Sequence, residues 1–123
     1  NPKKEYGLVG LAGPLSNFLL ALVFGLFLRI LPFITSNPSV PLILGFQIIV
    51  LVNISLGVFN LLPIPPLDGS SILFSFLRDD SPLKLFLSRY GFIILLVLIF
   101  SNSINFISPI ISILFSLFTD LPL

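Results

Sequence analysis

An almost unbroken apolar run from Leu8 to Phe33 is the feature that most limits what this chain can fold into. As a helix, the run would be about 39 Å long, which is more than the ~30 Å hydrocarbon core of a bilayer requires. Only 9% of the residues are charged, against about 25% in typical soluble domains, and 56% are hydrophobic. Lipid must therefore be the solvent for much of the surface, and the sequence predicts an integral membrane protein.

Further apolar runs follow, and together they predict an all-α fold, a polytopic transmembrane bundle of about four helices with a proline-rich unwound turn. The spans are expected at approximately residues 8–33, 42–62, 83–100 and 104–118 of a single membrane domain. The last run would be only about 22 Å long, so it is either a thin span or a half-buried helix. The net charge of +1 comes with no basic patch, so no nucleic-acid partner is predicted.

Local composition predicts where the first helix becomes regular and where one short turn lies. Gly10, Gly13 and Pro14 are expected to kink or fray the first helix, leaving regular helix from about Leu15. The short apolar segment 72–77 is expected to form an interfacial turn rather than a span.

Small residues recur every four positions along the first apolar run. Such a stripe lets another helix approach closely, and its members here are Gly13, Asn17, Ala21 and Gly25. Asn17 is the polar member of this stripe. Because a buried amide in lipid needs a partner, Asn17 is expected to bond across to another helix or to line a polar cavity.

The second apolar run carries polar residues on one face. Asn53, Gly57 and Asn60 lie at positions i, i+4 and i+7, which share one side of a helix. That face ends directly before a group of prolines. A polar seam between this face and Asn17 of the first helix is therefore expected.

Three prolines, Pro63, Pro65 and Pro66, interrupt the chain after the second run. Proline donates no backbone hydrogen bond and disfavours helix at the preceding residue, so the chain is expected to unwind here. Irregular backbone at membrane depth must be buried in protein or line a watery cavity, so the turn also indicates a cavity. An extended segment would leave carbonyls free to pair with another peptide, and Gly69 would allow a turn or a close approach.

Asp68 is the carboxylate next to this turn, and two interpretations of it stay open. It could be the N-cap of a helix that starts near Gly69. Alternatively, it could be a metal ligand or a proton-transfer group. Catalytic zinc requires three protein ligands, and the chain contains no His and no Cys to join the carboxylate. The residues alone therefore indicate a polar intramembrane cavity with one key Asp, which a transporter with an unwound helix would also satisfy.

The basic residues predict the orientation of the chain in the membrane. If two spans flank the polar segment 34–41, one side carries most of the positive charge, from Lys3, Lys4, Arg78, Lys84 and Arg89. Only Arg29 lies toward the other side. The proline turn and Asp68 are therefore expected on the cytosolic side.

Two motifs resemble those of one known family. The segment Asn60–Gly69 matches every fixed position of N-x-x-P-x-P-x-L-D-G, a pattern of the site-2 protease family of intramembrane zinc metalloproteases. The segment Ala12–Asn17 also resembles the A-G-P-x-x-N motif of that family, in the right order and at a plausible distance. Many members carry a second Gly after the D-G pair, where this chain has Ser70.

The resemblance implies a zinc-dependent endopeptidase with one zinc ion and a transmembrane protein as its substrate, working in the lipid bilayer. It also implies a bacterial cytoplasmic membrane as the location. The third family motif, H-E-x-x-H, lies on a preceding helix and is absent here, so the histidine ligands and the glutamate base would come from outside this chain. The absence of any Met likewise predicts that the chain is cut from a longer protein. By resemblance, Asp68 would be the third zinc ligand, Asn60 would steady the substrate or the oxyanion, and Asn17 would face the site.

The resemblance also implies how a substrate would be held. The segment formed by Pro63, Ile64, Pro65, Pro66 and Leu67 would bind an unwound stretch of the substrate as an added strand. Two other hypotheses stay open: a non-catalytic relative or membrane scaffold whose missing helix lacks the histidines, and a transporter built on a broken helix.

Overall fold

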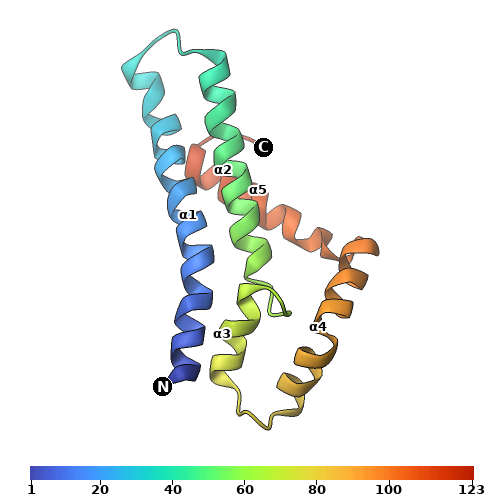
Figure 1. Cartoon of the computed structure of the whole chain (residues 1–123). Helices are drawn as coiled ribbons and strands as arrows, with labels where there is room; N and C mark the ends of the chain where they lie inside the picture. The colour runs from blue at the N-terminus through green and yellow to red at the C-terminus, as the bar shows by residue number, and fades with distance from the viewer.

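The computed structural model describes residues 1–123, and the chain is helical with no β-strand (Figure 1). Its elements, in chain order, are α1 (Pro2–Ile34), α2 (Val40–Asn60), α3 (Asp68–Phe76), α4 (Pro82–Phe100), the short 3-10 helix η1 (Ser103–Phe106) and α5 (Ile107–Thr119). The helices α1, α2 and α4 are long and apolar enough to cross a membrane, whereas α5 belongs to a shorter apolar stretch. The predicted all-α fold class is confirmed.

Helix α1 runs along most of the molecule, and α2, α3 and α5 pack against it (Figure 1). Its 33 residues correspond to about 50 Å. It starts at Pro2, where the Asn1 side chain accepts a hydrogen bond from the backbone N–H of Lys3 at 3.1 Å. The prediction that the helix frays before Leu15 was therefore wrong. Pro14 lies buried inside the helix, which continues through it although proline lacks the backbone N–H of a regular helical residue.

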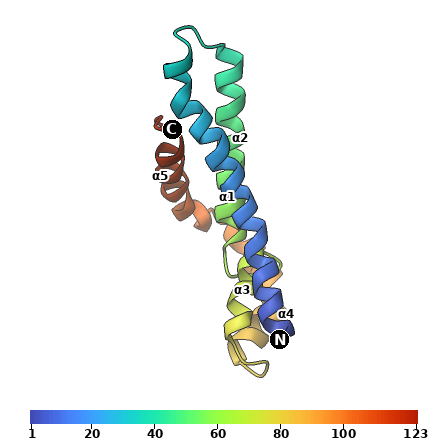
Figure 2. The same ribbon diagram turned by 90° about the vertical axis from the view of Figure 1, so that its left-hand side faces the viewer.

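Helices α2 and α3 lie one after the other along the side of α1, as two nearly perpendicular views show (Figures 1 and 2). The prediction of a turn at residues 72–77 was wrong, because these residues belong mostly to α3. Ser70 and Gly69 on α3 are buried, so tertiary packing stabilises a helix that is only nine residues long.

The hydrophobic core lies where α1, α2 and α5 meet. Its buried members are Ala21, Leu28, Val50, Ile54, Val58 and Phe115. The rings of Phe24 and Phe46 add an edge-to-face contact beside this core, with centroids 5.0 Å apart. In the small-residue stripe, Ala21 and Gly25 are buried as predicted, whereas Gly13 and Asn17 are half-buried.

The C-terminal end of α5 is attached to α1 at two neighbouring positions. A Cβ atom on Gly25 would lie 2.6 Å from the carbonyl oxygen of Phe118, so only glycine allows this approach. One turn further along α1, Arg29 donates hydrogen bonds to the carbonyls of Leu117 and Phe118. A cation that bonds to the last carbonyls of a helix complements the negative end of its dipole. Arg29 therefore has a partner in the protein.

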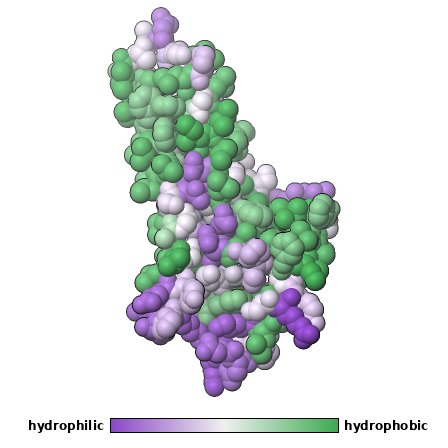
Figure 3. Space-filling view, viewed as in Figure 1, coloured by the Kyte–Doolittle hydropathy of each residue, from purple (hydrophilic) through white to green (hydrophobic).

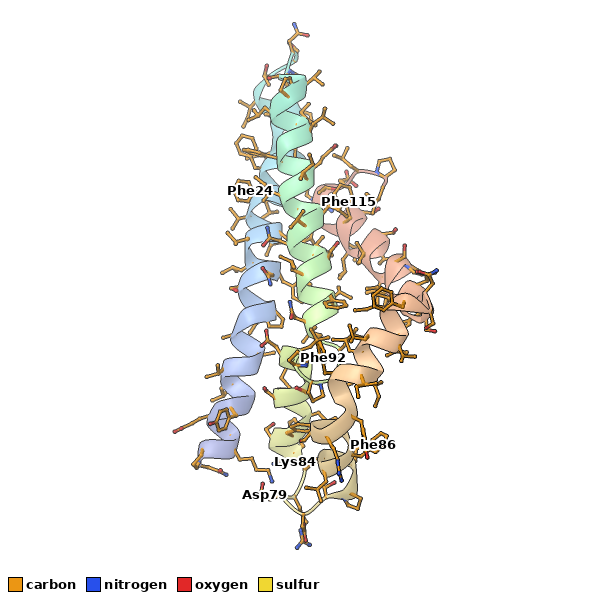
Figure 4. All side chains as sticks on the ribbon, turned by 45° about the vertical axis from the view of Figure 1, so that its right-hand side comes forward. Phe24, Asp79, Lys84, Phe86, Phe92 and Phe115 are labelled. Carbon is orange, nitrogen blue, oxygen red and sulfur yellow. The ribbon has the colours of Figure 1, made fainter.

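Charged groups from α1, α4 and the loop before α4 meet at the opposite end of the molecule. Lys84 donates a hydrogen bond to Oδ1 of Asp79 at 3.0 Å, and Nζ of Lys3 lies 3.7 Å from the same oxygen. Figure 4 shows Asp79 and Lys84 side by side at this end. The structure therefore places Lys3 and Lys84 at the same end of the bundle, as the charge pattern predicted.

This cluster predicts a pH dependence of stability. The hydrogen bond from Lys84, then the charges of Lys84 and Lys3, hold the pKa of Asp79 below its usual value of 3.8. A carboxyl with a lowered folded-state pKa stabilises the fold above the unfolded value and loses that contribution as pH falls through the folded value. We expect Asp79→Asn to lower the melting temperature at pH 6, and the difference from wild type to shrink at pH 3.

Thermal unfolding of both proteins in detergent at the two pH values checks this expectation. Asp120→Asn is the matched control, because Asp120 is exposed and forms no ion pair. A difference for Asp79→Asn that is equally large at pH 3 would show that the carboxylate charge is not its source.

Candidate functional site

Asp68 is the first residue of α3, directly after the unwound segment. The N-cap of α3 is Leu67, and no side-chain capping hydrogen bond is present, so the interpretation of Asp68 as an N-cap was wrong. The side chain is half-buried and takes part in no ion pair. Since it also forms no hydrogen bond with another side chain or with the backbone, its carboxylate has no partner within this chain.

Two glycines of α1 lie directly against Asp68. A Cβ atom on Gly13 would lie 2.6 Å from Oδ2 of Asp68, and one on Gly10 would lie 2.8 Å from its carbonyl oxygen. Contacts this short are possible only because both residues lack a side chain. Helix α1 therefore forms one wall of the space that holds the carboxylate, and the A-G-P-x-x-N segment meets the D-G pair in space.

The next residue, Gly69, attaches α3 to the end of α2. A Cβ atom at this position would lie 2.2 Å from the carbonyl oxygen of Leu61 and 2.3 Å from that of Leu62. Ser70 follows, and its buried hydroxyl donates a hydrogen bond to the carbonyl of Leu67 at 2.7 Å. Gly69 and Ser70 therefore hold the start of α3, and with it Asp68, in a defined position.

The proline segment is unwound, as predicted, but it is folded into turns and is not extended. The backbone N–H of Leu67 donates to the carbonyl of Ile64 at 2.9 Å, which closes one turn. The prediction of an extended segment was wrong, because this bond bends the chain back toward α3. The carbonyls of Pro63, Pro65 and Pro66 accept no backbone hydrogen bond, so they remain available to another group.

Helix α4 contacts the proline segment at Gly91. A Cβ atom on Gly91 would lie 2.7 Å from Cδ of Pro65, so the proline ring packs directly on the backbone of α4. Gly91 and Leu95 are the only buried residues of α4. The segment is therefore held between the start of α3 and the middle of α4, while Pro63 and Pro66 stay exposed.

The asparagine side chains do not form the hydrogen bonds across helices that the sequence suggested. The Nδ2 groups of Asn53 and Asn60 donate to the carbonyls of Ile49 and Leu56 in the preceding turn of α2, at 2.8 and 2.9 Å. This bonding pattern satisfies an amide within its own helix. Asn17 forms no hydrogen bond and is half-buried, so the alternative that it lines a polar cavity stays a prediction.

The chain can supply one ligand to a metal ion, but it cannot hold zinc alone. No group of three His, Cys, Asp or Glu side chains lies close enough together to bind a metal. A catalytic zinc site requires three protein ligands and an open position. Asp68 is suited to be one such ligand, because its carboxylate is half-buried and forms no ion pair or hydrogen bond within this chain. Any further ligands would have to come from outside this chain.

Sequence reasoning missed two residues that position this site. Gly10 contacts Asp68, and Gly91 contacts Pro65. The spacing of Gly7, Gly10 and Gly13 at i, i+3 and i+6 was a usable signal, because it places three small residues along one side of α1. Nothing in the sequence near Gly91 connects that residue with the proline segment.

Comparison with known proteins gives consistent results. The model of the family described as Peptidase family M50 matches residues 35–101. A Bacillus subtilis protein named "Putative zinc metalloprotease YwhC" is 38% identical over 103 residues, which cover 79% of this chain and 47% of that protein. A Methanocaldococcus jannaschii protein named "Putative zinc metalloprotease MJ0611" is 45% identical over 74 residues, which cover 57% of this chain and 34% of that protein.

The chain thus spans less than half the length of the curated relatives it matches. No solved structure matches it. The family match covers α2, the proline segment, α3 and α4, and therefore includes Asn60 and Asp68.

Proposed function

Because the chain belongs to Peptidase family M50, we propose that it forms part of a zinc-dependent intramembrane endopeptidase that hydrolyses peptide bonds in transmembrane substrates. The observation that carries this proposal is the unpaired carboxylate of Asp68, held against Gly13 at the start of α3. Three helices long enough to cross a membrane support a site at membrane depth.

In this proposal, Asp68 is one zinc ligand, and a preceding H-E-x-x-H helix outside this chain supplies two histidines and a glutamate base. Zinc, when bound, lowers the pKa of its water to about 7 and polarises the scissile carbonyl. The task of this chain is to hold the carboxylate in place. Gly13 leaves the space for it, while Gly69 and Ser70 fix the start of α3.

The proline segment would bind the substrate backbone. A transmembrane helix has all its backbone groups paired, so it must unwind before a peptide bond is accessible. The carbonyls of Pro63, Pro65 and Pro66 have no hydrogen bond in this chain and could accept bonds from an unwound substrate, with Ile64 and Leu67 contacting its side chains. A local opening of the turn between Ile64 and Leu67 would complete the added strand.

Asn60 would steady the substrate or the oxyanion from the end of α2, directly before the proline segment. We expect Asn60→Ala to lower kcat by about 10²-fold while zinc stays bound, as for other single oxyanion donors. Cleavage of a purified transmembrane substrate, together with zinc content, checks this. Asn53→Ala is a matched control, since Asn53 makes the same bond within α2. Loss of zinc in Asn60→Ala would contradict the assigned role.

Gly13 would act by leaving room for the carboxylate. A methyl group at this position would meet Oδ2 of Asp68, the movable end of a side chain, so the carboxylate can rotate away while the helices stay in place. We therefore expect Gly13→Ala to weaken zinc binding by about 10- to 100-fold, as changes around metal ligands do.

Zinc titration and thermal unfolding of Gly13→Ala would be measured together, because the proposal predicts a loss of affinity with little loss of stability. Ala12→Val adds methyl groups at the neighbouring exposed position and serves as the control. Unchanged zinc affinity in Gly13→Ala would show that the carboxylate is not held against α1 in the active protein.

A further inference from the structure

A cavity of about 180 Å³ lies between α1, α3 and α4, and neither Asp68 nor the proline segment lines it. Its lining residues are Lys3, Tyr6, Ser71, Phe74, Ser75 and Lys84. We propose that this cavity binds a phosphate group, of the kind carried by the headgroups of anionic membrane lipids. This inference does not depend on the proposed protease function.

The position of the cavity matches the level of lipid headgroups. Hydrophilic residues gather at the lower end of the molecule in Figure 3, whereas the upper part is largely hydrophobic. The charged residues at this end come from the start of α1 and the loop before α4, and charges are too costly to place in the hydrocarbon core. A cavity at this end therefore faces the phosphates of the surrounding lipid.

The charges around the cavity suit an anion. Two lysines from different helices, Lys3 and Lys84, approach the same oxygen of Asp79 at 3.7 and 3.0 Å. Their side chains are only 31% and 23% exposed, whereas that of Asp79 is 88% exposed. One carboxylate therefore balances two partly buried ammonium groups, and one positive charge is left over. Basic pockets between transmembrane helices are a known means of binding lipid headgroups.

The cavity also offers neutral hydrogen-bond donors and a fixed position for one lysine. The hydroxyls of Tyr6 and Ser71 form no hydrogen bond within the protein, whereas that of Ser75 donates to the carbonyl of Ile72 at 2.6 Å. Nζ of Lys84 lies 5.8 Å from the centre of the Phe74 ring, which holds the ammonium group beside the cavity. A phosphate has several acceptor oxygens and can use two ammonium groups and two hydroxyls together.

Asp79 and the phosphate would compete for the same lysines. The carboxylate lies on an exposed loop and bridges Lys3 and Lys84 when no other anion is present. A bound phosphate would displace it and would link α1 directly to α4. Helix α4 has few other contacts with α1, so this link should stabilise the bundle.

The test is thermal unfolding of the full-length protein in a neutral detergent with added phosphatidylglycerol, phosphatidylcholine or inorganic phosphate. We expect phosphatidylglycerol to raise the melting temperature by roughly 5 °C at saturation. Lys3→Gln and Lys84→Gln should remove this shift. Lys4→Gln and Arg89→Gln remove equal charges from the same helices outside the cavity, and they should keep it.

A second variant tests the competition without touching the lysines. Asp79→Asn should lower the melting temperature of the lipid-free protein but tighten phosphatidylglycerol binding. The expected increase in affinity is about two- to fivefold, because the lysines would no longer have to break an exposed ion pair before binding. A shift with inorganic phosphate that also depends on Lys3 and Lys84 would support the phosphate site and identify free phosphate as a ligand. A shift with phosphatidylglycerol alone would identify lipid as the ligand.

Three results would overturn the proposal. The first is no shift with any of the phosphates. The second is an equal shift in Lys3→Gln and Lys4→Gln, which would mean that only the total charge matters. The third is unchanged or weaker lipid binding in Asp79→Asn, which would mean that the two lysines serve only the ion pairs with Asp79.

Discussion

Replacing Asp68 with asparagine is expected to weaken zinc binding by more than about 100-fold and to reduce peptide cleavage by at least as much. Changes to groups that merely support a metal ligand already cost about 10- to 100-fold, so loss of a ligand charge should cost more. The fold should be little affected, because the carboxylate has no ion pair or hydrogen bond within this chain. Zinc content of the purified full-length protein and of the variant is the measurement.

Asp80→Asn provides the control for this experiment, since Asp80 lies in the exposed loop before α4 and pairs only with Arg78. Full cleavage by Asp68→Asn would show that the carboxylate is not a ligand. If neither the wild type nor the variant contains zinc, the protein would be a non-catalytic relative or a transporter of the broken-helix kind.

Replacing Gly69 with alanine is expected to destabilise the protein by about 3 kcal/mol, the upper end of the usual cost of overpacking. The added methyl group would lie 2.2 Å from the carbonyl oxygen of Leu61 and 2.3 Å from that of Leu62. Both are backbone atoms at the end of α2, so no side chain can rotate to make space. The start of α3 would have to move away from α2, and Asp68 would move with it.

Gly45→Ala is the matched control for Gly69→Ala, because a Cβ atom at Gly45 meets nothing within 4 Å. Gly45 lies inside α2, where alanine is favoured over glycine by about 0.5–1 kcal/mol, so this variant should be slightly stabilised. Thermal unfolding of the two variants in one detergent compares them directly. Equal stability of Gly69→Ala and wild type would show that α3 can start further from α2.

These predictions describe a site in which glycines allow close contacts between helices and loops. Gly13 leaves space for the Asp68 carboxylate, Gly69 lets α3 start against α2, and Gly91 admits the Pro65 ring. The Gly13 and Gly91 contacts join elements that are far apart in the chain, whereas the Gly69 contact joins α3 to the end of α2. Small residues at helix contacts are the expected means of close packing in a membrane, where burial of apolar surface drives association only weakly.

The sequence by itself determined the features that depend on local chemistry. Hydropathy and the low share of charge placed the long helices, and the prolines at positions 63, 65 and 66 ended α2 and forced an unwound segment. The N-x-x-P-x-P-x-L-D-G motif identified Asn60 and Asp68 as candidates, and their roles stay predictions. The helix and turn predictions hold because a lipid-facing surface and a proline act in the same way whatever the rest of the chain does.

Only the tertiary structure decided the features that depend on what packs against what. It showed α1 continuing through Pro14, α3 forming a helix where a turn was expected, and the asparagines of α2 bonding within their own helix. It also brought Asp68 against Gly13, which no spacing in the sequence encodes. The physical reason is that such contacts follow from the close approach of whole helices, which propensity and periodicity along one segment do not describe.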